Sequence, residues 1–490
     1  MEEWNGLWEQ KTFEYIKYED LPKDTKLLHL LWQFKVKPDR LKSRCCLNGT
    51  QESEDDYDDI YAPVCRHTTF RTLLWKANQS GYKIGQCDVQ QAYLYADNPV
   101  EQYCAVPKEF AKPGYAMRLK KMLYGLHASG KLWNDMFTLW MKETGYEQSK
   151  VDACLFTKRV DGKVLYVCLY VDDVLYTGDD GLMEQFKAAI NKRFKVRHLD
   201  ATTFLGLSIK YDRAKGVLTL GQWQYVEKVL KHFGFWDCKP RDTPMAKDRT
   251  LPKMEGECKD AALQRRYRQM VGSLMFLAVS TRPDICYAVK ELSRHLLHPS
   301  AEHMEAAGRV MRYLRGSIHH ELTYTREATA TFYGSADADW AGEPNTAKST
   351  TGYAFSLGSG SLSWKAGTQS IVTHSSTEAE LVALDEAARE LEYLRQLLQE
   401  FDVDVDLPVD IFQDNMSTIK LVLGGRFNPK TRHMNVRYHY THDLVTEGAV
   451  RCTHLATESM PSDVLTKALS KADHLRHTAV LLGRVRLEGG

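Results

Sequence analysis

The chain has 490 residues, a formal net charge of +1 and 43% hydrophobic residues. This length exceeds what one hydrophobic core usually serves, so we expect two to four domains with the composition of a soluble globular protein. The near-neutral total does not by itself indicate a nucleic-acid binder, although a neutral chain can carry a local basic face. No apolar run reaches transmembrane length and residues 1–4 start no signal peptide, so we expect no membrane partner.

The eleven cysteines are scattered along the chain without the spacing of a metal site. Cys45 and Cys46 are adjacent, and no C-x-x-C pair occurs. We therefore expect free thiols in a reducing compartment rather than a disulfide or zinc framework.

The N-terminal part of the chain predicts a β-hairpin and then an acidic loop. Apolar residues alternate at residues 28–37 and 41–47, which favours two strands, and Pro38-Asp39 marks the turn between them. The second strand carries Lys42 and Arg44. Residues 52–59 are rich in acids, which is typical of a solvated loop that is too exposed to hold a metal ion tightly.

The next segment combines helices with a strand that ends on an acid. Residues 67–79 predict a helix, and residues 82–88 predict a strand that ends at Asp88. A loop at residues 122–126 precedes a second long helix at residues 132–144. With the hairpin that follows, this order describes an α+β sheet with helices on one face.

Two adjacent aspartates follow a strongly apolar strand. Residues 154–159 and 164–170 predict a hairpin joined by Asp161-Gly162, a dipeptide that favours tight hairpin turns. The second strand leads into Tyr170-Val-Asp-Asp173, and apolar residues resume directly after it. Two carboxylates between buried strands are costly to desolvate unless a divalent cation neutralises them. A β-turn that merely uses Asp-Asp is the alternative, and these residues alone leave both interpretations open.

The middle of the chain is mainly helical. After a helix at residues 182–194, a second hairpin is predicted at residues 204–209 and 217–220. The helices predicted after it span residues 225–233, 267–279, 285–297 and 303–315. The last of them carries three arginines at helical spacing between residues 309 and 315. They offer a basic face, although a solvated surface is the simpler interpretation.

The composition changes again after Thr323. The sequence favours three strands, a long helix, a strand, a short helix, a fifth strand and a last helix. Their predicted ranges are 331–340, 351–357, 360–365, 375–401, 409–414, 416–423, 450–455 and 462–469. Four acids fall at strand ends or helix starts in this series: Asp337, Glu380, Asp414 and Asp463. Four such acids suit hydrolysis by two metal ions.

Several short motifs resemble those of copia-type (Pseudoviridae) long-terminal-repeat retrotransposons. Asp88-Val-Gln-Gln-Ala-Tyr93 is similar to the first catalytic motif of their reverse transcriptases, and Tyr170-Val-Asp-Asp173 is similar to the second. Three further stretches resemble the intervening loop, the primer grip and the thumb: Leu123-Tyr-Gly-Leu126, Phe204-Leu-Gly-Leu-Ser-Ile209, and Val271-Gly-Ser-Leu-Met275 with Thr281-Arg-Pro-Asp284. The resemblance covers nearly the whole chain, and the motifs follow one another in the same order as in that family.

The C-terminal acids resemble the copia-type RNase H. The strings that carry this likeness are Ser335-Ala-Asp-Ala-Asp-Trp-Ala341, Ser376-Thr-Glu-Ala-Glu380, Asp414-Asn415 and Ser462-Asp-Val-Leu-Thr-Lys467. Asp339 and Glu378 are competing neighbours, but register with the wider RNase H pattern favours Asp337 and Glu380. His454 is a candidate for assisting product release, although a surface histidine is the simpler interpretation.

The resemblance implies an α+β multidomain fold. A right-hand polymerase with fingers, palm and helical thumb would be followed by an RNase H-like α/β domain with a five-stranded mixed sheet. The implied domains are fingers and palm at residues 1–215, the thumb with any short connection at residues 216–322, and the RNase H domain at residues 323–490.

The resemblance also implies roles for individual residues. The catalytic, metal-binding residues would be Asp88, Asp172 and Asp173 in the polymerase, with Val89 offering a backbone oxygen, and Asp337, Glu380, Asp414 and Asp463 in the RNase H. Lys42 and Arg44 would meet the triphosphate of the nucleotide. Tyr93 would reject a 2′-hydroxyl by steric clash. The nucleotide pocket would also contain Tyr124 and Gly125, and the primer grip would contain Leu205 and Gly206.

The implied activity is that of an RNA-directed DNA polymerase with RNase H activity. It would copy retrotransposon RNA into cDNA, make the second strand on DNA, and degrade the RNA of the hybrid with two Mg²⁺ ions per site, for which Mn²⁺ is a candidate substitute. Its partners would be an RNA template, an RNA primer such as a tRNA, the RNA–DNA hybrid and dNTPs. A homodimer, and contacts with the integrase or capsid of the same element, are further candidate interactions. We expect it in the cytoplasm within virus-like particles, with the cDNA passing to the nucleus.

Two strings depart from the family pattern. Leu41-Lys-Ser-Arg-Cys-Cys-Leu-Asn-Gly49 stands where the family usually has Tyr-Lys-Ala-Arg-Leu-Val-Ala-Lys-Gly, and Gly125-Leu-His-Ala-Ser-Gly-Lys131 replaces Gly-Leu-Lys-Gln-Ala-Pro-Arg. These changes concern the nucleotide pocket and leave the metal ligands intact. Because no Gag, protease or integrase segment is recognised, we expect a processed fragment, a trimmed form or a separately encoded polymerase. The alternative is a domesticated or structural nucleic-acid-binding subunit with one or both sites inert, against which the seven intact acids argue.

Overall fold

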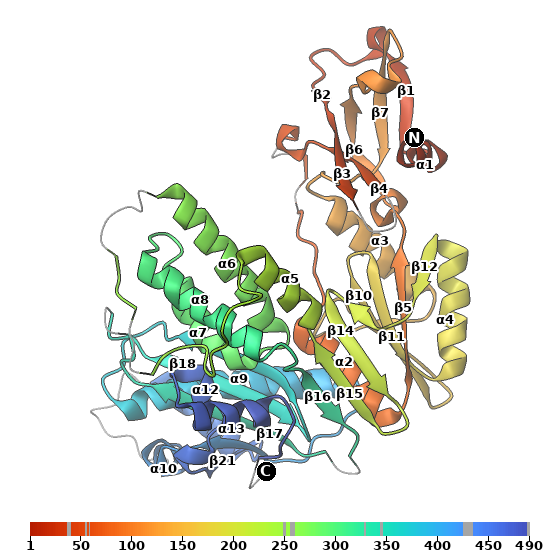
Figure 1. Cartoon of the computed structure of the whole chain (residues 1–490). Helices are drawn as coiled ribbons and strands as arrows, with labels where there is room; N and C mark the ends of the chain where they lie inside the picture. The colour runs from red at the N-terminus through yellow and green to blue at the C-terminus, as the bar shows by residue number, and fades with distance from the viewer. Residues whose placement is uncertain are drawn as a thin grey trace. The chain divides into compact units, whose positions relative to one another are not determined.

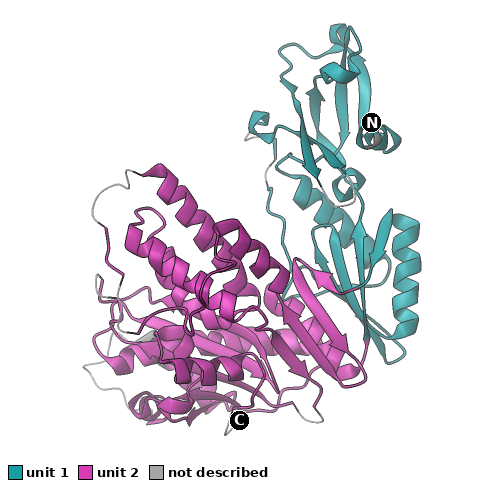
Figure 2. Cartoon of the chain, viewed as in Figure 1, with its two compact units in different colours: residues 1–66, 83–200 teal, residues 67–82, 201–490 magenta. Residues whose placement is uncertain are grey.

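The computed structural model forms two compact units, each built from two stretches of the chain (Figure 2). The first unit comprises residues 1–66 and 83–200, and the second comprises residues 67–82 and 201–490. The structure describes every residue except 37–40, 54–55, 58, 248–250, 255–259, 328–329, 344–345, 425–434 and 488–490. The turn predicted at Pro38-Asp39 lies outside the described residues. The predicted domain boundaries, which follow the family's fingers, palm, thumb and RNase H, stay a prediction.

The first unit begins with helix α1 (Glu2–Glu9) and a four-stranded sheet in the order β1-β7-β6-β2 (Figure 1). Its strands are β1 (Phe13–Lys17), β2 (Leu27–Leu28), β6 (Asp97–Cys104) and β7 (Tyr115–Lys121). Trp4 of the helix packs in one core with Phe13 and Met117 of the sheet. Its ring also stacks on Phe110 with the ring centroids 4.3 Å apart. The apolar side chains of this N-terminal segment therefore build a small core of their own.

The predicted N-terminal hairpin is confirmed as β3 (Leu30–Val36) paired with β4 (Leu41–Leu47). The prediction that the acidic loop after it is wholly solvated is wrong, because Glu52 is buried. Glu52 Oε2 accepts a hydrogen bond from the His127 backbone N–H at 2.8 Å, and Gln102 Nε2 donates to Glu52 Oε1 at 3.4 Å. This buried glutamate ties the acidic loop to two other segments of the first unit.

A six-stranded sheet in the order β12-β5-β11-β10-β9-β8 forms the rest of the first unit. Its strands are β5 (Lys83–Val89), β8 (Glu147–Gln148), β9 (Leu155–Val160), β10 (Lys163–Tyr170), β11 (Asp173–Gly178) and β12 (Val196–Leu199). The predicted β9–β10 turn is confirmed, and Asp161 and Gly162 both have the positive φ that such a turn needs, 50° and 75°. Helices α3 (Ser129–Glu143) and α4 (Asp180–Arg193) meet through Trp140 and Phe186, whose ring centroids are 6.4 Å apart.

Helix α2 (His67–Ser80) belongs to the second unit, although the chain on both sides of it belongs to the first. It lies against a four-stranded sheet in the order β13-β14-β15-β16 and against β19. These strands are β13 (Thr203–Phe204), β14 (Leu207–Asp212), β15 (Val217–Gly221), β16 (Leu322–Thr325) and β19 (Ser361–Thr368). Asn78 Nδ2 donates to the carbonyl oxygens of Gly216 at 3.0 Å and Tyr324 at 2.9 Å, and Arg71 Nε donates to that of Leu362 at 2.7 Å. Buried side-chain donors thus join this early helix to late parts of the chain.

Four predicted helices follow the β14–β15 hairpin: α5 (Trp223–Phe233), α6 (Ala261–Ser280), α7 (Cys286–Ser293) and α8 (Ala301–Gly316). The prediction that the third of them reaches residue 297 is wrong, since it ends at Ser293. Pro299 follows closely, and a proline disfavours helical geometry at the residue before it. The four helices share one hydrophobic core.

The arginines of α8 are partly buried, and each of them bonds to a neighbouring segment. Arg309 Nη2 donates to Thr243 Oγ1 at 2.8 Å. Arg312 Nε and Arg315 Nε each donate at 2.7 Å to a backbone carbonyl, of Lys239 and Trp236 respectively. The three side chains therefore hold the segment at residues 236–243 against the helix.

The C-terminal part of the second unit contains the predicted five-stranded mixed sheet, in the order β19-β18-β17-β20-β21. Strands β17 (Phe332–Asp339) and β18 (Thr350–Leu357) pair antiparallel, whereas β17, β20 (Val409–Gln413) and β21 (Val450–His454) are parallel. Helix α9 (Ser376–Glu400) lies against β17 and β18, and the Ser375 hydroxyl caps its start as predicted. Helices α10 (Met416–Gly424) and α11 (Asn435–Thr446) lie between β20 and β21 in the chain.

The last helix was predicted to start within residues 462–469, and a helix does start there but is interrupted. Helix α12 (Asp463–Thr466) is one turn long and ends at Lys467, whose backbone is extended with φ −145° and ψ 161°. Ala468 and Leu469 pack against the core that α5, α6, α7 and α8 share instead of continuing the helix. A separate helix, α13 (Lys471–Leu481), follows.

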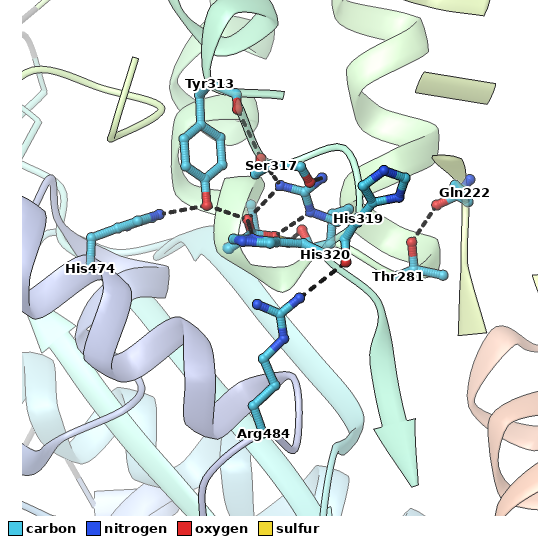
Figure 3. Close-up of polar contacts among 11 residues, drawn as sticks. Gln222, Thr281, Tyr313, Ser317, His319, His320, His474 and Arg484 are labelled. Atoms are coloured by element: carbon cyan, nitrogen blue, oxygen red, sulfur yellow. Dashed lines mark hydrogen bonds and ion pairs between the residues drawn. The ribbon is translucent and has the colours of Figure 1, made fainter. Parts of the chain in front are cut away.

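A buried polar network joins α13 to α8 within the second unit (Figure 3). Arg282 and Asp284 form an ion pair with Nη2 and Oδ2 2.7 Å apart. Tyr313 Oη donates to Asp284 Oδ2 at 2.6 Å, and His474 Nε2 lies 3.1 Å from Tyr313 Oη. Helix α8 and the C-terminal helix α13 are therefore connected by side-chain hydrogen bonds as well as by apolar packing.

The cysteines and the helices bear on two predictions about the whole chain. The ten described cysteines are free thiols, as expected. No described helix combines the length and the apolar character that crossing a membrane requires.

Candidate active sites

The first candidate site lies where strands β5 and β11 run side by side. Asp88 on β5 and Asp173 on β11 are directly opposite each other in the antiparallel register. Side chains of such a pair project from the same face of the sheet. The Val89 backbone N–H donates to the Asp172 carbonyl oxygen at 2.8 Å, which fixes the turn beside the strand. The structure therefore brings together the three aspartates that the sequence predicts for the polymerase.

The turn that carries Asp172 has an unusual backbone. Val171 has a φ of 55°, in the left-handed region that β-branched residues rarely adopt. The Trp133 indole N–H donates to the Val171 carbonyl oxygen at 2.6 Å. Because Trp133 is fully buried on α3, this bond anchors the strained turn to a rigid helix.

Burial and mutual repulsion raise the pKa values of both aspartates at the turn. Desolvation is the main cause for Asp172 and Asp173, and the Asp88 carboxylate adds to it. The pKa of Asp173 rises to about 6. A divalent cation would stabilise carboxylates in this setting, and their oxygens are the ligands that Mg²⁺ and Mn²⁺ prefer. The residues present therefore fit the predicted metal site.

Basic side chains face the same carboxylates. Arg197 on β12 pairs with Asp88 in the strand register, and its Nη2 lies 3.4 Å from Asp88 Oδ2. The positive charges of Arg44 and Lys42, both on β4, counteract the effect of burial on the pKa of Asp172. Sequence reasoning missed Arg197, because only the pairing of two strands more than a hundred residues apart places it beside Asp88.

The predicted nucleotide-pocket residues gather beside Asp172. The rings of Tyr93 and Tyr124 have centroids 4.6 Å apart, and the Arg44 guanidinium carbon lies 4.5 Å from the centroid of the Tyr124 ring. Burial, and then the Asp172 carboxylate, raise the pKa values of both tyrosines. The arginine and the two rings thus form one continuous surface next to the aspartates.

Gly125 allows the loop after β7 to touch strand β4. Its φ is 101°, and a Cβ atom there would lie 2.0 Å from the Leu47 carbonyl oxygen. The neighbouring Leu47 N–H donates to the Tyr124 carbonyl oxygen at 2.7 Å. Only glycine fits this contact without a shift of the backbone.

The predicted primer-grip residues form the turn between β13 and β14. Leu205 and Gly206 have positive φ values of 52° and 77°. Both residues belong to the second compact unit, whereas the three aspartates belong to the first. Their role in holding a primer stays a prediction.

The second candidate site is a compact group of three acids. Asp337, Glu380 and Asp414 each present an oxygen atom, and these atoms lie within 4.8 Å of one another. Asp337 is on β17 and Asp414 follows β20, so the parallel pairing of these strands brings both acids to the same edge of the sheet. Glu380 reaches them from the first turns of α9. In the part of the chain that the structure describes, no other group of acids, histidines or cysteines is gathered this closely, and the aspartates of the first site are farther apart.

The structure distinguishes Glu380 from its neighbour Glu378. Glu378 Oε2 accepts a hydrogen bond from the His374 backbone N–H at 2.6 Å, so it stabilises the start of α9. Asp339, the other competing acid, is not a member of the compact group. His454 is exposed, in agreement with its interpretation as a surface histidine.

Burial strongly favours the protonated forms of two acids at this site. Desolvation, and then repulsion by Asp337 and Asp414, raise the pKa of Glu380 to about 10. Desolvation and Asp337 raise the pKa of Asp463 to about 8. Side chains at 6% exposure or less, with only oxygen donors, fit a hard divalent cation that would keep them ionised.

Neighbouring polar side chains hold these acids in place. Gln413 Nε2 donates to Glu380 Oε2 at 3.2 Å, and Thr457 Oγ1 donates to Asp414 Oδ2 at 2.8 Å. Thr466 Oγ1 donates to Asp337 Oδ2. Sequence reasoning assigned none of these residues a role, since only the packing of distant segments places them beside the acids.

Lys467 also reaches the second site. Although burial alone would lower the pKa of its amine, the carboxylates of Asp337 and Asp463 raise it above its ordinary value. The signal for this contact was present in the sequence, because Lys467 follows Asp463 by four residues within the motif.

Comparison with known proteins identifies the family. Residues 11–247 match the family described as reverse transcriptase (RNA-dependent DNA polymerase). The Retrovirus-related Pol polyprotein from transposon TNT 1-94 of Nicotiana tabacum is 34% identical over 96% of this chain and 36% of its own length. The chain belongs to the copia-type reverse transcriptase family. It spans about a third of the length of the transposon polyproteins that it matches.

Two further relatives extend this result. The Pol polyprotein from transposon RE2 of Arabidopsis thaliana is 34% identical over 88% of this chain and 30% of its own length. The uncharacterized mitochondrial protein AtMg00810 of A. thaliana is 35% identical over 46% of this chain and 93% of its own length.

A solved structure has a similar fold. The foamy viral protease-reverse transcriptase dRH, in complex with double-stranded DNA, aligns with a TM-score of 0.51 at 13% identity. The alignment covers 92% of this chain and 68% of that one. The predicted fold class, a right-hand polymerase followed by an RNase H-like domain, is confirmed.

Proposed function

We propose that the chain is an RNA-directed DNA polymerase that copies retrotransposon RNA into cDNA and also synthesises the second strand on DNA. The observation that carries this proposal is the pairing of Asp88 with Asp173 on neighbouring strands, with Asp172 at the turn, in a chain of the reverse transcriptase family. The same chain would degrade the RNA strand of the RNA–DNA hybrid at Asp337, Glu380, Asp414 and Asp463.

At the polymerase site, Asp88, Asp172, Asp173 and the Val89 carbonyl oxygen would hold two Mg²⁺ ions. These ions would supply the charge that favours ionisation of the primer 3′-hydroxyl and neutralises the triphosphate. Catalysis then depends on how the chain positions the reactants.

The surrounding side chains of the first unit would bind and select the nucleotide. Lys42 and Arg44 would offer positive charge to the triphosphate, since both already act on the Asp172 carboxylate. Tyr93 would lie under the sugar and exclude a 2′-hydroxyl, while Tyr124 and Gly125 would line the pocket. Leu205 and Gly206, in the second unit, would support the primer strand.

At the RNase H site, the compact group of Asp337, Glu380 and Asp414, together with Asp463, would bind divalent cations. The cations would supply an activated water and stabilise the leaving oxygen of the RNA. The protein contributes fixed carboxylates, which Gln413 and Thr457 hold by hydrogen bonds.

The partners and location follow from this proposal. The chain would bind an RNA template, an RNA primer such as a tRNA, the hybrid product and dNTPs. We also propose that it works in the cytoplasm within virus-like particles, beside the capsid and integrase of its element, and that the cDNA passes to the nucleus. A homodimer is a candidate assembly of the chain.

Two separate variants test the two activities in one protein. Asp173→Asn is expected to lower extension of a DNA primer on RNA by about a thousandfold or more and to leave cleavage of a labelled RNA–DNA hybrid in place. Asp414→Asn is expected to do the reverse. An unmodified chain that neither extends the primer nor cuts the hybrid with Mg²⁺ or Mn²⁺ would contradict the proposal, as it would indicate an inert nucleic-acid-binding subunit. Loss of both activities in one variant would contradict the assignment of two sites.

A further inference from the structure

Lys467 reaches into the RNase H site from the end of α12. Its Nζ lies 2.9 Å from Asp463 Oδ1 and 3.8 Å from Asp337 Oδ2. The side chains of Asp463 and Asp337 are only 6% and 2% exposed, whereas that of Lys467 is 34% exposed. One ammonium group therefore touches two buried carboxylates from the solvent side.

The four acids of the site do not form one uniform cluster. Asp337, Glu380 and Asp414 have oxygens within 4.8 Å of one another, and Asp463 is not part of that group. The carboxylate of Asp463 instead has the Lys467 ammonium as a charged neighbour. Asp337 belongs to the compact group and also contacts Lys467, so it links the three acids to the Lys467–Asp463 pair.

This arrangement places a monovalent cation where a second divalent ion would otherwise find ligands. A divalent cation bound between Asp337 and Asp463 would compete with the Lys467 ammonium for the same carboxylate oxygens. The ammonium has a flexible four-carbon stem and a partly exposed position, so it can swing toward solvent without unfolding of α12. An incoming RNA phosphate is an anion that would attract it.

We propose that Lys467 is a positioning residue that occupies the second-ion position of the RNase H site until a hybrid binds. This inference rests on the proposed RNase H function. In the substrate-free protein the group of Asp337, Glu380 and Asp414 holds one divalent ion, and Lys467 neutralises Asp463. The phosphate of the bound hybrid draws the ammonium away from Asp463, which then becomes a ligand for the second ion.

Counting Mn²⁺ ions in the full chain tests this inference directly. The parent protein carries Asp172→Asn and Asp173→Asn, so that ions at the polymerase site do not contribute. Electron paramagnetic resonance and calorimetry are expected to find one Mn²⁺ ion at the RNase H site without substrate, and Asp414→Asn should remove it. Lys467→Gln should bind a second ion, or bind Mn²⁺ about 10–100-fold more tightly. Lys467→Arg should restore the one-ion state.

Matched controls separate a local role from a general charge effect. Lys471 lies four residues further on, is exposed and pairs with Asp242 at 3.2 Å, so Lys471→Gln should leave Mn²⁺ binding unchanged. Asp463→Asn gives a second test that does not remove the lysine. It should leave the substrate-free protein with one Mn²⁺ ion and prevent the second ion from binding with a non-cleavable hybrid.

The outcomes distinguish the inference from the function on which it rests. Two ions in the substrate-free parent, or unchanged or weaker Mn²⁺ binding in a folded Lys467→Gln variant, would overturn the inference and leave the RNase H proposal standing. Loss of the first ion in Asp463→Asn would overturn it as well. A wild-type chain that binds no Mn²⁺ at this site and cuts no hybrid would overturn both.

Discussion

At Gly125 the loop before α3 comes into direct contact with strand β4. The glycine combines a left-handed backbone with a neighbour only 2.0 Å from the position of a Cβ atom. This contact joins Tyr124, on one side of the predicted nucleotide pocket, to the strand that carries Lys42 and Arg44. The shape of the pocket therefore depends on one residue without a side chain.

Gly125→Ala should destabilise the first unit strongly. We expect a loss of about 3 kcal/mol or more in the free energy of unfolding, because strain and a backbone clash add together. Gly114→Ala is the matched control, since Gly114 has a φ of 80° but nothing within 4 Å of the Cβ position. It should cost about 1 kcal/mol. Urea unfolding of both variants measures the difference, and equal losses would contradict the clash.

Residue patterns in the sequence predicted most side chains of both candidate sites, but not which neighbouring residues contact them. The acids are recognisable because each follows a strand or opens a helix within a distinctive string. Arg197 beside Asp88, and Lys467 beside Asp337, depend on distances of a few ångströms between packed elements. The burial of Glu52 was missed for the same reason, since its hydrogen-bond partners come from distant loops.

At the scale of elements, helix α3 controls the turn between β10 and β11. The Trp133 indole N–H is bonded to the Val171 carbonyl oxygen, and the Val171 backbone is strained. A strained turn persists only when its surroundings hold it. The helix thereby helps to position Asp172.

Trp133→Phe should weaken polymerisation more than folding. The phenylalanine ring keeps most of the apolar packing but cannot donate a hydrogen bond, so we expect a stability loss of about 1 kcal/mol. Release of the turn should lower primer extension by about tenfold to a hundredfold. Hybrid cleavage by the same preparation is the internal control and should not change. A variant with normal primer extension would show that the turn holds its geometry without this bond.

Hairpins and amphipathic helices were predictable because their information is local. The β9–β10 hairpin follows from alternating residues around Asp161-Gly162, and α9 follows from its apolar spacing and serine cap. The sheet β1-β7-β6-β2 was not predicted, because β1 pairs with β7, which lies about a hundred residues further along the chain. The break between α12 and α13 was not predicted, since a helical pattern does not reveal that the chain turns into another core.

At the scale of the whole molecule, the second unit contains buried histidines that must stay neutral. Desolvation lowers the pKa values of His295, His474 and His477 from 6.5 to about 4. Between those values the unfolded chain binds more protons than the folded chain, so stability falls as the pH decreases from about 6.5 toward 4. The pKa of Asp284 lies well below its ordinary value, so its ion pair with Arg282 persists through this range.

The raised pKa values of Glu380 and Asp463 oppose this slope in the metal-free protein, because these acids bind more protons in the folded state than in the unfolded state. The three histidines outnumber them, so acid unfolding should begin in the second unit. Each buried histidine is expected to contribute about 1.4 kcal/mol per pH unit to the slope of stability against pH. Hydrogen exchange at pH 7 and pH 5 should show a greater loss of protection in the second unit than in the first. His477→Gln should reduce the slope, and the exposed His454→Gln should not. An equal loss of protection in both units would contradict this account.

The placement of α2 has a consequence for synthesis on the ribosome. The helix is complete at residue 80, but its partners Gly216, Tyr324 and Leu362 emerge much later. Translation of the intervening roughly 280 residues takes on the order of tens of seconds. During that time the native cover of α2 is incomplete: Phe70, which is buried in the finished protein, can stack on Phe204 early, whereas the partners on β16 and β19 are made last.

A nascent chain that stops near residue 247, where the family match ends, would leave this helix without its partners on β16 and β19. Such a truncated product would be a target for chaperones and proteases even though it contains all three polymerase aspartates. The RNase H-like sheet would thus be needed to complete the fold of an early helix, whether or not it ever cuts RNA.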